Sequence, residues 1–257
     1  MQLDPTAAAA GVKLIAHDTI GSTNTEAWTL ARGGECGPLW ITAARQTAGR
    51  GRRGSIWASE PGNLYTSLLL ADAAPSERAG ELSFVASLAV HDAVLEIASG
   101  LGSRLAVKWP NDLLIDGAKF AGILIEAGGP RAVIGIGVNC AQHPNATSYP
   151  ATDLAAAGIE VSPEQLFTRL SRTMMVRLDQ WQRGAGFASI RADWLARVAG
   201  LGQDIRVRLP QRELCGHFET LDETGRLLLR FPDGRLEAVS AGEVFAIAEA
   251  QQMLSPL

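Results

Sequence analysis

Hydrophobic and polar positions along this chain follow two periodicities, one typical of strands and one typical of helices. Short apolar runs bounded by turn residues predict the strands of a first domain, at 13–17, 39–43, 64–71, 105–109, 113–115, 120–127 and 132–139. Apolar residues at helical spacing predict helices at 81–99, 163–183 and 188–199. Turn residues at 116–117 and 128–130 join three of the strands, which indicates antiparallel hairpins.

Three local features complete this first domain. Ser22 or Thr23 can cap a helix that begins soon after the first strand, with Glu26 in its first turn. Trp181 and Trp194 lie on predicted helices and are expected to pack in the core. Residues 7–10, all alanine, are expected to form a loose tail.

A different pattern begins near residue 200. Short apolar strands separated by turn residues are predicted at 204–209, 215–221, 227–231 and 236–239. Regularly spaced short strands are typical of a small β-barrel. We therefore expect two domains, 1–200 and 201–257. The expected fold class is α+β, with a mixed, largely antiparallel sheet flanked by helices, followed by a small SH3-like β-barrel.

Composition and charge narrow the function classes. The 257 residues carry a formal net charge of −4, so the chain lacks the basic field typical of nucleic-acid-binding proteins. Cys36, Cys140 and Cys215 are widely spaced and odd in number, which indicates neither a zinc site nor a disulfide framework. No apolar run reaches the roughly 18 residues of a membrane span, and the amino terminus lacks a basic leader. A cytoplasmic protein without membrane contacts is expected.

The strongest chemical signal is a glycine–arginine loop at residues 46–57, Gln-Thr-Ala-Gly-Arg-Gly-Arg-Arg-Gly-Ser-Ile-Trp. Glycine allows close approach of the backbone to a ligand, and arginine offers forked donors to carboxylate and phosphate. The glycine spacing also fits the dinucleotide-binding pattern. That pattern requires a following helix, and turn residues at 61–63 oppose one. A solvated basic loop is the other alternative.

Three further motifs are ambiguous when taken singly. Lys108–Asp112, Lys-Trp-Pro-Asn-Asp, either carries chemistry or is an ordinary junction between a strand and a turn. Lys119 opens an apolar strand that contains Gly122, so it either binds an anion or protects a sheet edge. The glycines of residues 135–139, Gly-Ile-Gly-Val-Asn, indicate a pocket floor or a bulge.

Taken together, these motifs resemble the biotin–protein ligase family in order and spacing. Ser22-Thr23-Asn24, the glycine–arginine loop, Lys108–Asp112, Lys119–Leu124 and Gly135–Asn139 carry the resemblance. It covers residues 14–139 strongly and the carboxy-terminal domain more loosely. It implies the class II synthetase-like core of that family. The implied activity is formation of biotinyl-5′-adenylate from biotin and ATP with release of pyrophosphate. Biotin then passes to one lysine of a biotin carboxyl carrier domain, such as that of acetyl-CoA carboxylase.

The resemblance also implies roles for individual residues. The biotin-binding set is Ser22, Thr23, Asn24, Gln46, Arg50, Gly51, Arg52, Lys119, Gly122 and Ile123. The set for ATP and the adenylate is Arg50, Arg52, Arg53, Trp57, Lys108, Asn111, Lys119 and Asn139. Arg52, Lys119 and Asp112 are the implied catalytic residues, with Asp112 orienting or deprotonating the incoming lysine amine. Magnesium is implied by the use of ATP, and the sequence does not identify its ligands.

Some features depart from the family or leave alternatives open. Ser55 stands where many relatives carry arginine, which weakens a phosphate or loop contact. Only 21 residues precede Ser22, whereas a winged helix needs roughly 60, so no operator binding is expected. The loops 50–57 and 141–152 are expected to close over the adenylate. A lipoate ligase, a nucleic-acid-binding module and a catalytically silent biotin binder are the rival interpretations. The oligomeric state, monomer or homodimer, stays open.

Overall fold

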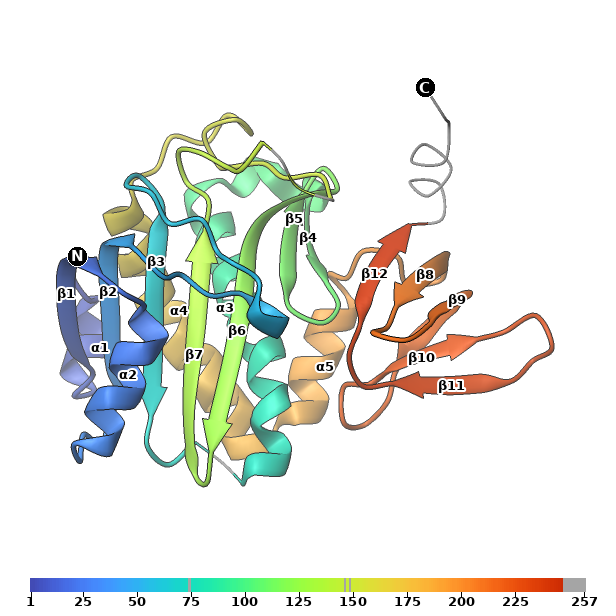
Figure 1. Ribbon diagram of the computed structural model, residues 1–257, viewed down its shortest axis with the longest axis horizontal. Coiled ribbons are helices and arrows are strands. Elements are labelled where there is room, and N and C mark those ends of the chain that lie inside the picture. Colours follow the sequence, from blue (N-terminus) through green and yellow to red (C-terminus); the bar gives the residue numbers. More distant parts are fainter. Residues whose placement is uncertain (74, 146, 148, 247–257) are drawn as a thin grey trace.

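The computed structural model describes residues 1–73, 75–145, 147 and 149–246 and shows a large sheet beside a smaller one (Figure 1). The large sheet has seven strands in the order β1-β2-β3-β7-β6-β5-β4. Their bounds are Lys13–Ile20 (β1), Leu39–Gln46 (β2), Leu64–Leu70 (β3), Leu105–Lys108 (β4), Asp112–Ile115 (β5), Ala118–Gly128 (β6) and Arg131–Val138 (β7). β1 and β2 run parallel, and every other neighbouring pair is antiparallel. The prediction of a mixed, largely antiparallel sheet is confirmed.

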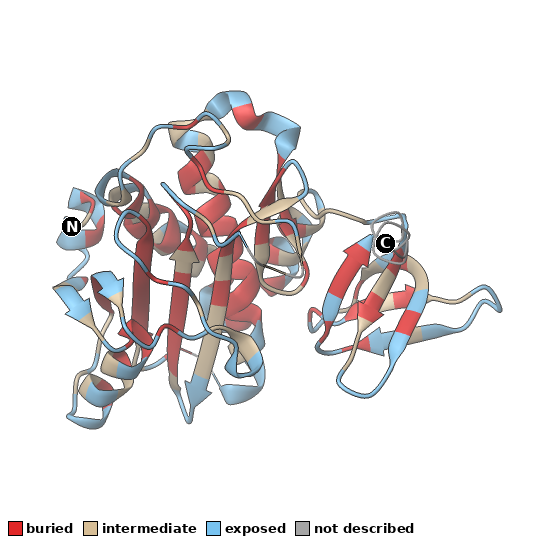
Figure 2. Ribbon diagram, turned by 45° about the horizontal axis from the view of Figure 1, so that its top comes forward, coloured by how far each residue is buried: buried red, intermediate tan, exposed pale blue. Residues whose placement is uncertain are grey.

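Helices cover both faces of this sheet. α2 (Thr23–Arg32) lies on one face, and α3 (Leu82–Ile97), α4 (Pro163–Trp181) and α5 (Phe187–Leu195) lie on the other (Figure 1). Ala27 and Ala31 of α2 are fully buried against the sheet, where small side chains allow a close approach of the helix. Trp181 and Trp194 are almost completely buried in the main core, as predicted. Figure 2 shows how burial concentrates in the sheet and in α3 and α4.

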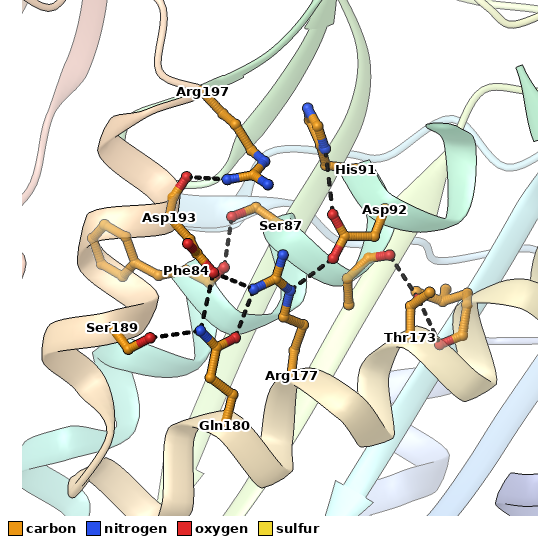
Figure 3. Close-up of polar contacts among 12 residues, drawn as sticks. Phe84, Ser87, His91, Asp92, Thr173, Arg177, Gln180, Ser189, Asp193 and Arg197 are labelled. Carbon is orange, nitrogen blue, oxygen red and sulfur yellow. Dashed lines mark hydrogen bonds and ion pairs between the residues drawn. The ribbon is translucent and has the colours of Figure 1, made fainter. Parts of the chain in front are cut away.

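A partly buried polar network joins the three helices of the second face (Figure 3). The Arg177 side chain of α4 donates to Asp92 of α3 at 2.7 Å and to Asp193 of α5 at 2.5 Å. It also donates to Gln180 at 2.6 Å. Burial alone would raise the pKa of Asp92, but the nearby His91 ring, 3.6 Å away, and the hydrogen bond from Arg177 outweigh it and hold the pKa below its usual value. The network therefore links the helices through charge as well as through apolar packing.

The expected loose tail at residues 7–10 is wrong. Residues Pro5–Ala9 form helix α1, and Ala7 is buried. Asp4 caps this helix by accepting from the Thr6 backbone N–H at 2.9 Å, and Pro5 occupies the first turn, where proline is favoured. The Asp4 backbone N–H donates to Ser171 on α4 at 2.9 Å, which ties the segment to the core.

The smaller sheet is antiparallel and has five strands in the order β11-β10-β9-β8-β12. Its strands are Asp204–Arg208 (β8), Glu213–Leu221 (β9), Leu227–Arg230 (β10), Leu236–Val239 (β11) and Glu243–Ala246 (β12). The sequence prediction missed β12, and residues 247–257 of the expected second domain lie outside the described residues. The Trp109 indole donates to the Gly225 carbonyl at 3.1 Å, so the two sheets meet at the Lys-Trp-Pro-Asn-Asp motif.

Two long segments connect these elements, 47–63 between β2 and β3 and 139–162 between β7 and α4. Within the described residues, four 3₁₀ helices occur, at Arg52–Gly54, Ser76–Glu81, Ser99–Arg104 and Gln182–Gly184. The first lies in the glycine–arginine loop, where the dinucleotide pattern would require a long helix, so that alternative is wrong. Within the described part of the chain, no helix is long and apolar enough to cross a membrane.

Candidate active site

A cavity of about 530 Å³ lies on the α2 face of the large sheet, between the glycine–arginine loop and β12. In Figure 1 this loop leaves β2 and crosses in front of β3, β7 and β6. The cavity gathers all but one of the predicted site residues: Ser22, Thr23, Asn24, Gln46, Arg50, Gly51, Arg52, Arg53, Trp57, Lys108, Asn111, Asp112, Lys119, Gly122 and Ile123. Segments far apart in the sequence therefore meet at one place, as the resemblance implied.

Glycines of β6 and β7 form the floor of the cavity. Gly122 and Gly137 are paired across the two strands, and the register of β7 is regular through both pairings. The Trp57 indole lies over both glycines: a Cβ added to Gly137 would be 2.5 Å from the ring, and one added to Gly122 would be 3.0 Å from it. The glycines thus form a floor, and the bulge alternative is wrong. They leave room for a flat group against the sheet.

Lys119 stands beside this floor as a paired cation. Its Nζ lies 2.6 Å from Asp112 Oδ1 on the neighbouring strand β5. The same Nζ lies 5.5 Å from the Trp57 ring centre and 5.2 Å from the Tyr149 ring centre, within cation–π range. Because β6 is an interior strand, the proposal that Lys119 protects a sheet edge is wrong. Its surroundings suit a cation that faces an anionic ligand.

Arg52 is fixed to the same sheet through Asn111. The Arg52 guanidinium donates to Asn111 Oδ1 at 2.8 Å, while Asn111 Nδ2 donates to the Ile123 carbonyl at 2.8 Å. Burial lowers the pKa of Arg52, and nearby Arg53 lowers it further, against the opposing effect of Asp112 and Glu243. Arginine stays protonated in proteins all the same. Arg52 is therefore a partly desolvated cation, which interacts more strongly with an anion than an exposed one does.

Ser55 closes the tip of the glycine–arginine loop on itself. Its hydroxyl donates to the Arg52 carbonyl at 2.9 Å, and its carbonyl accepts from the Gly51 N–H at 2.7 Å. A Cβ on Gly51 would lie 2.4 Å from the Ser55 hydroxyl, so the turn requires glycine there. Arg53 adopts a left-handed conformation, with φ of 54°. Ser55 therefore stabilises the turn through both its side chain and its backbone.

A chain of polar side chains forms the opposite end of the cavity, at the start of α2. Ser22 occupies the position before α2 without a side-chain capping bond. Gln46 Oε1 accepts from the Thr23 N–H at 2.9 Å and from the Thr23 hydroxyl at 3.1 Å. Gln46 Nε2 donates to Ser59 at 3.0 Å, and Ser59 donates to the Trp57 carbonyl at 2.8 Å. The chain thus connects the helix to the far end of the glycine–arginine loop.

A second branch of this chain was not anticipated from sequence. Ser67 of β3 is fully buried, and its hydroxyl lies 2.7 Å from the Thr23 hydroxyl and 2.5 Å from Asn24 Oδ1. Asn24 Nδ2 donates to Glu126 at 2.8 Å. Glu126 also accepts two hydrogen bonds from Arg50, at 2.9 and 3.0 Å. A serine within an apolar strand was the signal that could have revealed this branch.

Asn139 is the predicted site residue that does not line the cavity. It is buried, and its Nδ2 donates to the Thr152 carbonyl at 3.1 Å. The Thr152 N–H in turn donates to the Lys119 carbonyl at 2.9 Å. Asn139 therefore anchors the end of the loop 141–152, of which residues 146 and 148 lie outside the described residues. Tyr149 of the same loop does line the cavity.

The small sheet contributes one wall of the cavity, which the sequence prediction missed. This wall is formed by residues 242–245, at the start of β12. The Phe245 ring lies 5.5 Å from Lys108 Nζ and 5.2 and 4.8 Å from the guanidinium carbons of Arg206 and Arg208. Three cations therefore surround one aromatic ring at this end of the cavity. Glu243 adds a carboxylate that faces Arg52.

The carboxylates of the cavity wall are few. Asp112 and Glu243 are the two that line it within the described residues, and no group of three or more metal-binding side chains occurs in that part of the chain. Magnesium in nucleotide sites is commonly held by one or two carboxylates together with phosphates. The wall therefore fits an ion that arrives with ATP.

Comparison with known proteins gives two matches along the chain. A sequence model of the Biotin/lipoate A/B protein ligase family matches residues 18–140. A model of the Biotin protein ligase C terminal domain matches residues 200–246. The first range holds most of the cavity wall, and the second includes β12. Both halves of the candidate site thus fall within matched regions.

Individual relatives agree with these matches. A biotin–[acetyl-CoA-carboxylase] ligase of Paracoccus denitrificans is 42% identical over 87% of this chain and 96% of its own length. The ligase of that name from Mycobacterium tuberculosis is 36% identical, over 87% of this chain and 85% of its own length. The biotin protein ligase of Aquifex aeolicus, solved with biotin and ATP, has a TM-score of 0.77 and 26% identity, covering 91% of this chain and 97% of its own. The chain belongs to the biotin protein ligase family.

Proposed function

We propose that this protein is an ATP-dependent biotin–protein ligase. The observation that carries the proposal is one cavity in which a glycine floor, a polar end at α2 and the cations Arg52 and Lys119 meet. The relatives named above are biotin ligases, and two solved neighbours contain biotin with ATP or biotinyl-5-AMP. Biotin would lie beside the Trp57 indole, with its ring near Gly122 and Ile123 and its polar groups toward Thr23 and Gln46.

The first step joins two anions. A biotin carboxylate oxygen attacks the α-phosphorus of ATP, a new P–O bond forms, and the bond to the leaving pyrophosphate breaks. Arg52 and Lys119 offset the repulsion between carboxylate and phosphate and stabilise the charge that develops on the phosphoryl oxygens. Bound magnesium supplies further charge neutralisation on the phosphates. Asp112 holds the Lys119 ammonium in place at 2.6 Å.

The second step transfers biotin to the carrier. The amine of a carrier lysine attacks the acyl carbon, AMP leaves, and an amide bond forms. In this proposal Asp112 orients the amine or accepts its proton, and the position of its carboxylate at the cavity wall beside Lys119 supports that role. Closure of residues 50–57 and 141–152 would exclude water from the reactive anhydride. We also propose that the protein acts in the cytoplasm.

Pyrophosphate release tests the first step. With MgATP and biotin, we expect pyrophosphate at a rate that saturates with biotin. With lipoate or octanoate in place of biotin, we expect release at background level. Release that depends on lipoate and not on biotin would assign the protein to the lipoate branch instead. Biotin binding without pyrophosphate release would identify a silent binder.

A further inference from the structure

Glu126 is a charged residue just outside the cavity wall, and it contacts two residues that do line the cavity, Asn24 and Arg50. It follows Gly122 and Leu124 along β6, on the strand that forms the cavity floor. Its carboxylate accepts two hydrogen bonds from Arg50 and one from Asn24. It thereby joins the glycine–arginine loop to the start of α2, two segments that both line the cavity.

The carboxylate dictates which way the Asn24 amide points. An ionised carboxylate only accepts hydrogen bonds, so the amide NH₂ must face Glu126 and the amide oxygen must face Ser67. The Ser67 hydroxyl is fully buried and lies within 2.8 Å of both Asn24 and Thr23. Reversal of the amide would set its oxygen against the Glu126 carboxylate, where neither group can donate a hydrogen bond, and the bond at 2.8 Å from Asn24 Nδ2 would be lost.

The Glu126 carboxylate also binds the Arg50 guanidinium. Both terminal nitrogens of Arg50 donate to Glu126, at 2.9 and 3.0 Å, in a bidentate pair. Arg52, which is held by Asn111, and Lys119, which is held by Asp112, are not tied to Glu126 and can face the reacting anions. Arg50 therefore has the contacts of an anchor for the loop rather than of a ligand for phosphate.

We infer that Glu126 is a positioning residue for biotin recognition, which fixes the Asn24 amide and anchors the glycine–arginine loop through Arg50. This inference rests on the proposed function for its biotin part, while the anchoring of the loop is independent of any substrate. Glu126 acts through its two partners and does not line the cavity itself. Its loss should therefore affect the biotin end of the site and leave the Arg52–Asn111 end in place.

A first experiment needs no substrate. Limited trypsin digestion of the unliganded Glu126→Gln variant is followed by mass spectrometry of cleavage after residues 50, 52 and 53. A glutamine amide cannot accept three hydrogen bonds in the same geometry, so we expect cleavage in the loop to be about tenfold faster than in wild type. The matched control is Glu219→Gln, which breaks a similar bidentate pair with Arg230 on the small sheet. Unchanged cleavage in Glu126→Gln would overturn the anchoring role.

A second experiment separates positioning from general damage. In the pyrophosphate assay, Glu126→Gln should raise the KM for biotin roughly tenfold or more and leave the KM for ATP within about twofold. The biotin KM of the Arg50→Gln/Glu126→Gln double variant should be no higher than that of the poorer single variant, because both substitutions break the same Arg50–Glu126 ion pair. Equal rises in both KM values, or tighter biotin binding, would overturn the inference. A wild-type enzyme inactive with biotin would instead refute the proposed function, and the trypsin result would still stand.

Discussion

Gly137 illustrates how a missing side chain creates the site at the scale of one residue. It lies in the middle of the sheet, on β7, and is regularly paired with both neighbouring strands. A glycine at such a position weakens the strand, and it often marks a place where another group approaches the backbone closely. Trp57 is what comes close, with ring atoms 2.5 to 2.7 Å from the position of an added Cβ. The indole is rigid, so a side chain at this position would displace it from the floor.

We therefore predict that Gly137→Ala displaces Trp57 and the end of the glycine–arginine loop. The expected result is a rise in the biotin KM on the order of 10- to 100-fold, because the loop carries groups that position the substrate. Steady-state pyrophosphate release measures it. Gly80→Ala is the matched control, since an added Cβ there has open space around it and should change nothing. Normal kinetics in Gly137→Ala would contradict the assigned position of Trp57.

The helices α3, α4 and α5 are held together at the element scale by the Arg177 network. Asp92 and Asp193 both have a pKa below the usual value. For Asp193, the hydrogen bond from Gln180 is the largest cause, and the ion pair with Arg177 adds to it. A carboxyl whose pKa is lower in the folded state than in the unfolded state contributes stability above its unfolded value of about 4. That contribution is lost as the pH falls through the lowered folded value.

Asp92→Asn should therefore reduce the acid sensitivity of the fold. At pH 7 we expect a loss of about 1–3 kcal/mol in the free energy of unfolding, because Arg177 loses a charged partner. Below pH 4 the difference from wild type should begin to shrink, because the unfolded wild-type chain then takes up a proton at this carboxyl while the folded carboxylate, with its lowered pKa, still resists it. Urea unfolding at pH 7 and at pH 3.5 measures both values. A difference that is constant with pH would contradict the role of the charged network.

Some of the helices and strands could be predicted from the sequence, and others could not. Long elements with strong periodicity, such as α4, and the three strands from residue 113 to residue 139 were predicted, because apolar spacing and turn residues agreed there. β12 has only four residues, Glu-Val-Phe-Ala, and its two buried positions are adjacent, so it lacks the alternation of a strand. α1 is dominated by alanines, and its Asp-Pro start was overlooked as a capping signal. The contacts of Glu126 and Ser59 depend on tertiary packing and leave no local pattern, whereas Ser67 left only the weak signal of a serine within an apolar strand.

For the whole molecule, the candidate site lies between the two sheets rather than within one of them. β12 supplies Glu243 and Phe245 to the wall, and Trp109 ties the small sheet to the large one. The carboxy-terminal domain therefore does more than cover the core. We propose that this end of the cavity binds the triphosphate of ATP, because Lys108 lines it and the Phe245 ring of its wall is flanked by Arg206 and Arg208.

Phe245→Leu tests this contribution. Leucine keeps most of the apolar volume but has no aromatic face for the three cations, so we expect the ATP KM to rise about 2- to 30-fold. The biotin KM should stay near the wild-type value, because the polar end at α2 lies across the cavity. Initial rates at varied ATP and biotin measure the split. A rise confined to the biotin KM would contradict the assignment of this end to ATP.

The most direct test of the account is transfer of biotin to a carrier. Purified protein is incubated with biotin, MgATP and a biotin carboxyl carrier domain, and the carrier is analysed by intact mass. The account predicts a single biotin adduct for wild type, and a rate reduced by at least roughly 100-fold in Arg52→Ala and in Lys119→Ala, because each loses a charge that stabilises the transition state. An unmodified carrier with wild type, or undiminished transfer by both variants, would contradict the account.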